Sequence, residues 1–252
     1  MKNQITELLS NYGPIYTLFW DIPPHIEDKG LNELARKLQP GIFINDRGYD
    51  EGDFSTPERE IQAIPDTTRF ERMTEACNSV GVQSWGYRVE EDFYSLSYLT
   101  CAIDRIMAMG GSYLLNVGPN EKGVITEEYA SRIQAIGDWY NRMEGCLVGH
   151  EADTFDYGVK RDPCLITKKN GKSYFHFYDG LISNAVNMKN VPSMPTSVRL
   201  MNAGSGLSFG FDLLPENFNF DTGKMGPAGF HIKQIPVDKF AGEPIVIEMT
   251  FA

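Results

Sequence analysis

Apolar residues in the first 150 positions recur at two spacings, one typical of helices and the other of strands. Spacings of three and four predict amphipathic helices, and continuous β-branched or aromatic runs predict strands. Helices are expected over 2–12, 31–38, 70–78, 95–109 and 126–143, and strands over 15–21, 41–46, 82–87 and 112–117. A polar loop is expected from residue 47 to 68. Because helices and strands alternate, residues 1–150 are predicted to form βα units around a parallel sheet, with strands 15–21 and 112–117 buried.

The pattern changes near Gly149, after which no long helical period occurs. Short apolar runs alternate with turn signals, and Asn170-Gly171 is the dipeptide favoured in type I′ hairpins. Strands are expected at 164–168, 173–178, 197–201, 229–235 and 245–251. Residues 151–252 are therefore predicted to form a small antiparallel β-sandwich, which makes the whole chain α/β with a domain boundary at residue 150.

Composition limits the partners that the chain is expected to have. The net charge of −11 disfavours nucleic acid and anionic membranes, whereas the 12% aromatic content suits a neutral ligand such as a sugar. No apolar run approaches the length of about 20 residues that spans a bilayer. The first residues, from Met1, lack the apolar core of a signal peptide, so the compartment stays open and cytoplasmic is the default.

The metal-binding residue types are scattered. The four cysteines have neither CxxC nor finger spacing, and the four histidines are equally dispersed. These residues are Cys77, Cys101, Cys146, Cys164, His25, His150, His176 and His231. We therefore expect reduced, structural cysteines, no metal site and no cofactor.

Charged and aromatic residues follow the predicted strands at their carboxyl ends. Asp21 closes the first strand, Arg47 follows the second, Glu58 comes from the polar loop, and Trp85 ends the 82–87 run. Ligands bind at that edge of a parallel sheet, so these side chains are predicted to share one rim. Single acids at strand ends are common, yet paired carboxylates beside aromatics are typical of a glycoside hydrolase. Arg47 is expected to keep a neighbouring carboxylate ionised and to bind sugar hydroxyls.

Six segments in a characteristic order carry a resemblance to a known family. They are Asn11-Tyr12-Gly13-Pro14 with Leu18–Asp21, Ile44-Asn45-Asp46-Arg47, Gly52–Glu58, Ser84-Trp85-Gly86-Tyr87, Gly110–Pro119 with Gly123-Val124-Ile125, and Ile136-Gly137-Asp138-Trp139. The chain resembles the α-L-fucosidases of glycoside hydrolase family 29. The resemblance implies that residues 1–150 are the C-terminal part of a (β/α)8 TIM barrel, followed by the β-sandwich. It also implies an exo-acting retaining enzyme that acts on fucosylated glycans.

The resemblance also implies roles for single residues. Asp21 matches the nucleophile that forms a covalent fucosyl intermediate, and Arg47 matches a substrate-contacting arginine. Glu58 matches the acid/base, with Glu75 as the alternative and Glu58 favoured. Phe19 and Trp85 match aromatics that line the fucose pocket.

The chain departs from the family pattern upstream of Asp21. The half-barrel and the histidines that bind fucose in family members have no counterpart here, and half a barrel leaves two open sheet edges. The chain is therefore expected to need a missing N-terminal half or a second copy in a homo-oligomer. The alternatives are a non-catalytic fragment that binds sugar weakly, and a barrel protein that binds a different sugar.

Overall fold

A computed structural model describes residues 1–22, 27–59, 61–66, 68–212, 218–219, 221–226 and 228–252. The chain divides into two compact units, each described here by itself. Unit 1 comprises 1–64, 70–78 and 111–115, and unit 2 comprises 65–69, 79–110 and 116–252. This grouping differs from the boundary expected at residue 150, which stays a prediction.

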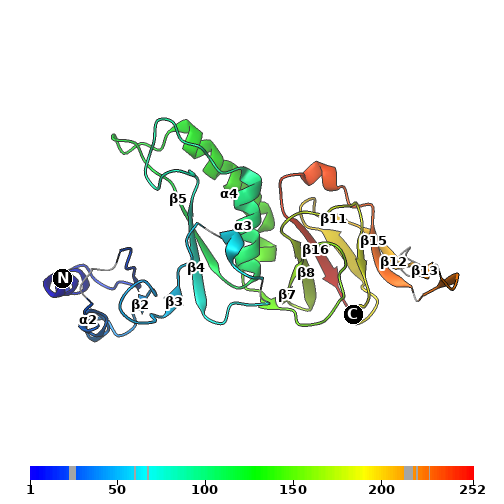
Figure 1. The fold of residues 1–252 in the computed structure, drawn as a ribbon, viewed down its shortest axis with the longest axis horizontal. Helices are drawn as coiled ribbons and strands as arrows, with labels where there is room; N and C mark the ends of the chain where they lie inside the picture. Colours follow the sequence, from blue (N-terminus) through cyan, green and yellow to red (C-terminus); the bar gives the residue numbers. More distant parts are fainter. Residues whose placement is uncertain (23–26, 60, 67, 213–217, 220, 227) are drawn as a thin grey trace. The chain divides into compact units, whose positions relative to one another are not determined.

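Unit 1 contains two helices and short parallel strands (Figure 1). Its elements are α1 (Lys2–Asn11), β1 (Thr17–Leu18), α2 (Gly30–Leu38), β2 (Phe43–Ile44), β3 (Phe54–Ser55), η1 (Ile61–Ala63), and most of β4 (Met73–Ser79) and β5 (Ser112–Asn116). Strand β1 pairs in parallel with β2, and β3 with β4. A parallel bridge between Asn45 and Phe54 links the two pairs. The parallel arrangement predicted from the alternating pattern is therefore confirmed for β1 and β2, which lie within the predicted strands 15–21 and 41–46.

One face of the first strands is covered and the other is open. Leu18, Trp20 and Ile44 pack with apolar residues of α1 and α2 into a core cluster. Thr17, the neighbour of Leu18 in β1, is exposed on the opposite face, because consecutive strand residues point to opposite sides. The expectation that strand 15–21 is buried on both faces is therefore wrong. Strand β5, expected to be buried, is likewise half-open, with Leu114 exposed.

Two further sequence predictions for this region are wrong. The sequence predicts a helix over 70–78, yet residues 73–79 form the strand β4. Parallel pairing with β3, which lies about 20 residues earlier in the chain, stabilises this strand. The loop expected over 47–68 contains β3, which is only two residues long and therefore leaves no periodic pattern. In unit 2, the run 82–87 is irregular rather than a strand.

Unit 2 begins with two long helices, α3 (Leu96–Ala108) and α4 (Glu127–Leu147), which pack against each other (Figure 1). Ser95 caps α3 by accepting a hydrogen bond from the Tyr98 amide at 3.1 Å. Thr126 occupies the expected N-cap position of α4, although its side chain forms no capping bond, and the helix continues four residues beyond Met143.

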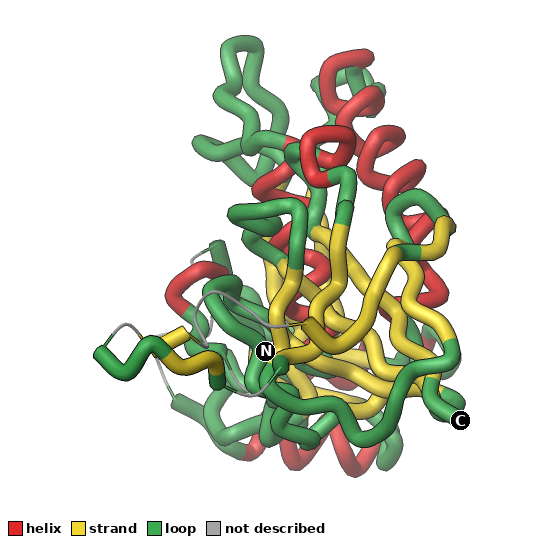
Figure 2. Tube along the Cα trace, turned by 90° about the vertical axis from the view of Figure 1, so that its right-hand side faces the viewer, coloured by secondary structure: helices red, strands yellow, loops and turns green. Residues whose placement is uncertain are grey.

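The rest of unit 2 is built of antiparallel sheets, seen as neighbouring yellow tubes near the C-terminus in Figure 2. Its strands are β6 (Glu151–Ala152), β7 (Leu165–Lys169), β8 (Lys172–Phe177), β9 (Val186–Met188), β10 (Ser197–Leu200), β11 (Ser205–Gly206), β12 (Ser208–Asp212), β13 (Phe218–Asn219), β14 (Lys224–Met225), β15 (Gly229–Lys233) and β16 (Ile245–Thr250), with η3 at Val237–Phe240. The larger sheet has the order β11-β10-β16-β8-β7-β6, and a second has the order β12-β15-β9.

Residues from both sheets form one core, which is consistent with the predicted sandwich. Phe175 and Phe177 of β8 are fully buried in the same cluster as Phe230 of β15. The predicted hairpin is confirmed, because Asn170 and Gly171 have φ of 52° and 74°, as a type I′ turn requires. Within the described residues, no helix is long and apolar enough to cross a membrane.

Candidate active site

Three charged side chains of unit 1 follow three strands at the same interval. Asp21, Arg47 and Glu58 each come three residues after the last residue of β1, β2 and β3. Because these strands are linked in parallel, their carboxyl ends lie at one edge of the sheet. The equal interval therefore places the three side chains next to one another.

Arg47 is the centre of this cluster. Its Nη1 lies 2.5 Å from Glu58 Oε2 and 3.8 Å from Asp21 Oδ1. Its Nε donates to the Thr56 hydroxyl and its Nη2 to the Thr56 carbonyl, both at 2.9 Å. Two bonds to one residue fix the planar guanidinium and turn its remaining nitrogen toward both carboxylates.

Thr56 is itself held by Asp46, a residue that the sequence pattern did not single out. Asp46 Oδ1 accepts from the Thr56 amide at 3.1 Å and from its hydroxyl at 2.9 Å. Because that hydroxyl donates its proton to Asp46, its oxygen is free to accept from Arg47. Asp46 therefore positions Arg47 through Thr56.

Asn45 fixes the backbone that leads to Asp21. Its side-chain oxygen accepts from the Trp20 amide at 2.7 Å, and its nitrogen donates to the Trp20 carbonyl at 3.0 Å. The backbone pairing of β1 with β2 ends at Leu18 and Ile44. Beyond that point, the side-chain amide of Asn45 supplies the hydrogen bonds that a neighbouring strand would give to Trp20. The Trp20 indole also donates to Asn32 at 2.9 Å, and all three residues are buried. The signal in the sequence is a polar residue inside an apolar strand run.

The two acids differ in exposure, and an aromatic ring lies beside them. The side chain of Asp21 is 82% exposed and that of Glu58 is 36% exposed. The guanidinium carbon of Arg47 lies 5.3 Å from the centre of the Phe19 ring, within cation–π range. The structure therefore brings together four of the predicted residues, Asp21, Arg47, Glu58 and Phe19.

Cys77 lies behind this cluster and is chemically quiet. It forms a parallel bridge with Glu58, in which its amide donates to the Pro57 carbonyl at 2.8 Å. Burial raises the pKa of the Cys77 thiol to about 11, against the opposing effect of Arg47. The thiol is thus protonated near neutral pH and is a poor nucleophile.

Glu75, the alternative acid/base, lies deeper in the sheet. The pairing of Ser55 with Thr74 places Glu75 level with Thr56, two positions before Cys77. It lines a pocket of about 260 Å³ formed mainly by residues at the amino ends of the strands, including Tyr16, Phe43 and Met73. No contact between Glu75 and Arg47 is among the hydrogen bonds and ion pairs of the described residues.

Trp85 belongs to unit 2, and its predicted place on the same rim as Asp21 stays a prediction. Its carbonyl accepts from Asn116 Nδ2 at 2.5 Å. A Cβ on Gly118 would lie 2.3 Å from the Tyr87 amide nitrogen, so only glycine lets the two segments approach this closely. Among the described residues, no three His, Cys, Asp or Glu side chains are grouped to hold a metal ion.

Comparison with known proteins decides the family. The family model described as alpha-L-fucosidase matches residues 1–144, which is more than half of the chain. The chain belongs to the alpha-L-fucosidase family. The tissue alpha-L-fucosidase of Rattus norvegicus is 38% identical over 68 residues, which are 26% of this chain and 15% of that protein. The Mus musculus protein is 26% identical over 131 residues, 51% of this chain and 28% of its own length.

Solved structures of similar proteins share the fold. Alpha-L-fucosidase isoenzyme 1 from Paenibacillus thiaminolyticus superposes with a TM-score of 0.75 at 24% identity, over 100% of this chain and 61% of its own. The Thermotoga maritima alpha-fucosidase gives a TM-score of 0.68 at 21% identity, over 99% of this chain and 55% of its own. This chain therefore spans little more than half the length of these fucosidase structures.

Proposed function

We propose that this chain carries the nucleophile and acid/base of an exo-acting retaining α-L-fucosidase, which hydrolyses terminal α-L-fucosides of glycans. The observation that carries the proposal is the contact of one arginine with two carboxylates at the carboxyl ends of adjacent parallel strands. Membership of the family supports the substrate class. The net charge of −11 suits a neutral glycan, and the mechanism needs no cofactor.

The separation of the two acids supports retention. Asp21 Oδ1 and Glu58 Oε2 lie 3.8 and 2.5 Å from the same nitrogen, so they are no farther apart than the sum of these distances, 6.3 Å. Retaining glycosidases have carboxyl groups about 5–5.5 Å apart, whereas inverting enzymes need about 6.5–9.5 Å to admit a water. Asp21 and Glu58 are thus close enough to act on the same glycosidic bond, as double displacement requires.

The proposed reaction has two steps. The Asp21 carboxylate attacks the anomeric carbon while protonated Glu58 gives its proton to the leaving oxygen, and a glycosyl ester forms on Asp21. Glu58, now a carboxylate, takes a proton from water as that water attacks the anomeric carbon. Fucose leaves with its configuration retained, and Asp21 is again a carboxylate. Arg47 binds sugar hydroxyls and orients both acids, and Phe19 packs on the C6 methyl.

Glu75 is kept as the alternative acid for a specific reason. Glu58 Oε2 is already engaged by Arg47 at 2.5 Å, whereas a general acid must reach the leaving oxygen when the sugar arrives. We favour Glu58 because its oxygen is close to Asp21, and Glu75 lies two positions deeper. Loss of activity in Glu58→Gln but not Glu75→Gln, with recovery on an aryl fucoside with a good leaving group, identifies Glu58 as the acid.

The acidic cluster is exposed to solvent in this chain. Asp21 is 82% exposed, and an exposed acid lacks the water-excluded surroundings in which charge stabilisation is strong. We infer that β1–β5 are the C-terminal part of a (β/α)8 barrel. The remaining barrel strands come from a preceding segment of the protein or from a second copy. The same openness supports the second candidate function, a non-catalytic fragment that binds a sugar weakly.

The first experiment is turnover of a chromogenic aryl α-L-fucoside by the chain over a range of protein concentrations. We expect Asp21→Asn to lower kcat at least about 10³-fold, because a nucleophile acts in both steps. Glu51→Gln, an exposed acid on the neighbouring segment, is the matched control and should keep full activity. Proton NMR should show the α-anomer of fucose first.

The outcomes separate the candidates. Activity that rises more steeply than protein concentration indicates completion of the site by a second copy. Initial release of the β-anomer contradicts retention, and an active Asp21→Asn variant contradicts the nucleophile assignment. No turnover at any concentration supports the non-catalytic fragment for this chain alone.

A further inference from the structure

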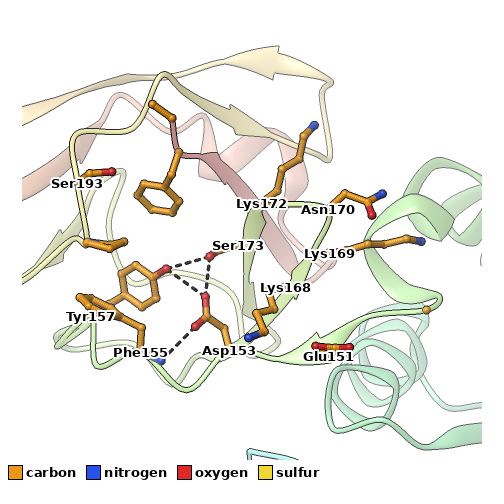
Figure 3. A pocket seen from close by; sticks show the side chains of 15 residues that line it. Glu151, Asp153, Phe155, Tyr157, Lys168, Lys169, Asn170, Lys172, Ser173 and Ser193 are labelled. Atoms are coloured by element: carbon orange, nitrogen blue, oxygen red, sulfur yellow. Dashed lines mark hydrogen bonds between the residues drawn. The ribbon is translucent and has the colours of Figure 1, made fainter.

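A second cavity lies in unit 2, on the antiparallel sheets. It has a volume of about 610 Å³, within the range of small-molecule sites. Four segments line it: 149–157, the β7–β8 hairpin at 168–173, 192–193 and the end of the chain at 251–252 (Figure 3). All of them lie within unit 2, so this cavity is complete without any residue of the acidic cluster around Arg47.

One wall of the cavity is aromatic and held in place. The Phe155 ring is 39% exposed and packs edge-on against Tyr157 with 4.7 Å between ring centres. Tyr157 is buried, and its hydroxyl lies 2.9 Å from Ser173 Oγ and 3.1 Å from Asp153 Oδ2. Asp153 also accepts from the Phe155 amide at 3.1 Å. The hydrogen bonds drawn in Figure 3 hold the Phe155 backbone and the Tyr157 hydroxyl, and the exposed Phe155 ring packs against the Tyr157 ring.

The other walls of the cavity carry polar side chains that have no hydrogen-bond partner among the described residues. Glu151, Lys168, Asn170 and Ser193 line the cavity, and within the described residues none of their side chains forms a hydrogen bond or ion pair. Together they offer both donors and acceptors. Asp153, Tyr157 and Ser173, by contrast, are bonded to one another, so they give rigidity rather than binding capacity.

The charges around the cavity nearly cancel. Three lysines line it, yet Lys172 pairs with buried Glu248 at 3.1 Å, and Lys169 donates to the Val148 carbonyl at 2.6 Å. Lys168 lies directly opposite Glu151 across the β6–β7 pair, and Asp153 adds another acid. Lys169 keeps its charge, because a carbonyl is neutral. The acids Glu151, Asp153 and Glu248 nevertheless equal the three lysines in number, so the cavity lacks the unbalanced positive charge that an anion-selective site needs.

We propose that this cavity binds a neutral saccharide, with a sugar ring packed on Phe155 and its hydroxyls bonded to Lys168, Asn170 and Glu151. An aromatic face suits the C–H side of a pyranose, and hydroxyl groups need donors and acceptors in equal measure. The site would hold a glycan on the same protein as the acidic cluster. Binding here requires no turnover, so the inference stands apart from the proposed hydrolysis.

The test is titration of the full chain, carrying Asp21→Asn to prevent turnover, with lactose and with 2′-fucosyllactose, followed by calorimetry and NMR. Saturable binding is expected, weakened about tenfold or more by Phe155→Ala, a change that corresponds to about 1.4 kcal/mol. Lys168→Ala should weaken binding as well. Phe211→Ala is the matched control, because Phe211 is 49% exposed on the same unit and lies outside the cavity. Circular dichroism verifies that each variant is folded.

Three outcomes would overturn the proposal. The first is absence of binding by either neutral sugar. The second is binding that resists both Phe155→Ala and Lys168→Ala but is lost in Arg47→Ala, which would place the sugar at the acidic cluster. The third is binding of a sulfated chondroitin disaccharide without binding of the neutral sugars, which would make the cavity an anion site.

Discussion

At the scale of single residues, the acidic cluster of Asp21, Arg47 and Glu58 depends on neighbouring polar side chains that form hydrogen bonds to the backbone and to Arg47. Asn45 bonds both backbone groups of Trp20, and Thr56 bonds Arg47 twice. Each of these side chains is buried, where an unmade hydrogen bond costs more than a made one gains. The charged side chain at the centre of the cluster and the backbone that leads to Asp21 are therefore positioned by buried polar neighbours.

Removal of the Asn45 amide tests this dependence. Asn45→Ala leaves the Trp20 amide and carbonyl without partners, and we expect the free energy of unfolding to fall by about 1–3 kcal/mol. Urea denaturation measures the change. Asn3→Ala, an exposed asparagine in the same unit, should change it by less than about 0.5 kcal/mol. Equal effects of the two substitutions would refute the positioning role of Asn45.

At the scale of elements, a buried histidine chain ties α3 and α4 to the larger sheet. His176 of β8 lies 3.0 Å from Asp104 of α3 and 3.0 Å from Thr167 of β7. Thr167 is 3.0 Å from His150, whose Nε2 lies 2.9 Å from the Gly145 carbonyl. A carbonyl only accepts, so His150 Nε2 carries a proton. Neutral His150 then accepts from Thr167, and Thr167 accepts from His176.

This chain of donors predicts a loss of stability in mild acid. Burial is the main cause that lowers the pKa of His150 below its ordinary 6.5. Below pH 6.5 the unfolded chain therefore binds a proton that the folded chain resists, and the free energy of unfolding falls as the pH decreases. Urea denaturation at pH 7 and pH 5 measures the difference.

The matched variants isolate His150 as the source. His150→Gln keeps a donor for Gly145 and an acceptor for Thr167 but does not titrate, so its stability should change less between pH 7 and pH 5. Asn141→Ala, exposed on α4, should retain the wild-type dependence. If His150→Gln also retains the full dependence, His150 is not the titrating group.

At the scale of the whole molecule, the open face of the parallel strands is the main physical liability. Tyr16 is 72%, Met73 54% and Leu114 42% exposed, all on the strands of unit 1 or beside them. Exposed apolar side chains on a sheet favour association.

We therefore expect the isolated chain to self-associate reversibly. Analytical ultracentrifugation should show a concentration-dependent rise in mass. Met73→Lys should shift the association constant at least about tenfold toward monomer, because it places a charge on the apolar face. Val89→Lys, a substitution of a residue that is 85% exposed in unit 2, is the control and should leave the association unchanged. A monodisperse monomer at all concentrations would contradict the prediction.

The sequence by itself determined the features that depend on local patterns. The helices over 2–12, 31–38 and 95–109 and the Asn170-Gly171 hairpin follow from apolar spacing and turn chemistry, which act between near neighbours. The strand ends at Asp21 and Arg47 were also visible, because each charge follows an apolar run. These residues, with the six family segments, were enough to predict the family.

Only the tertiary structure decided what depends on distant partners. Strand β3 and the strand character of β4 arise from parallel pairing, which leaves no short-range period in the sequence. The clamp of Asn45 on Trp20 joins residues 25 apart, and the Asp104–His176 contact joins residues 72 apart. The exposure of Asp21 and of the apolar strand face likewise depends on which elements are present to cover them. Short-range sequence patterns therefore indicated the charged residues Asp21 and Arg47, whereas contacts between distant residues determined how these side chains are arranged.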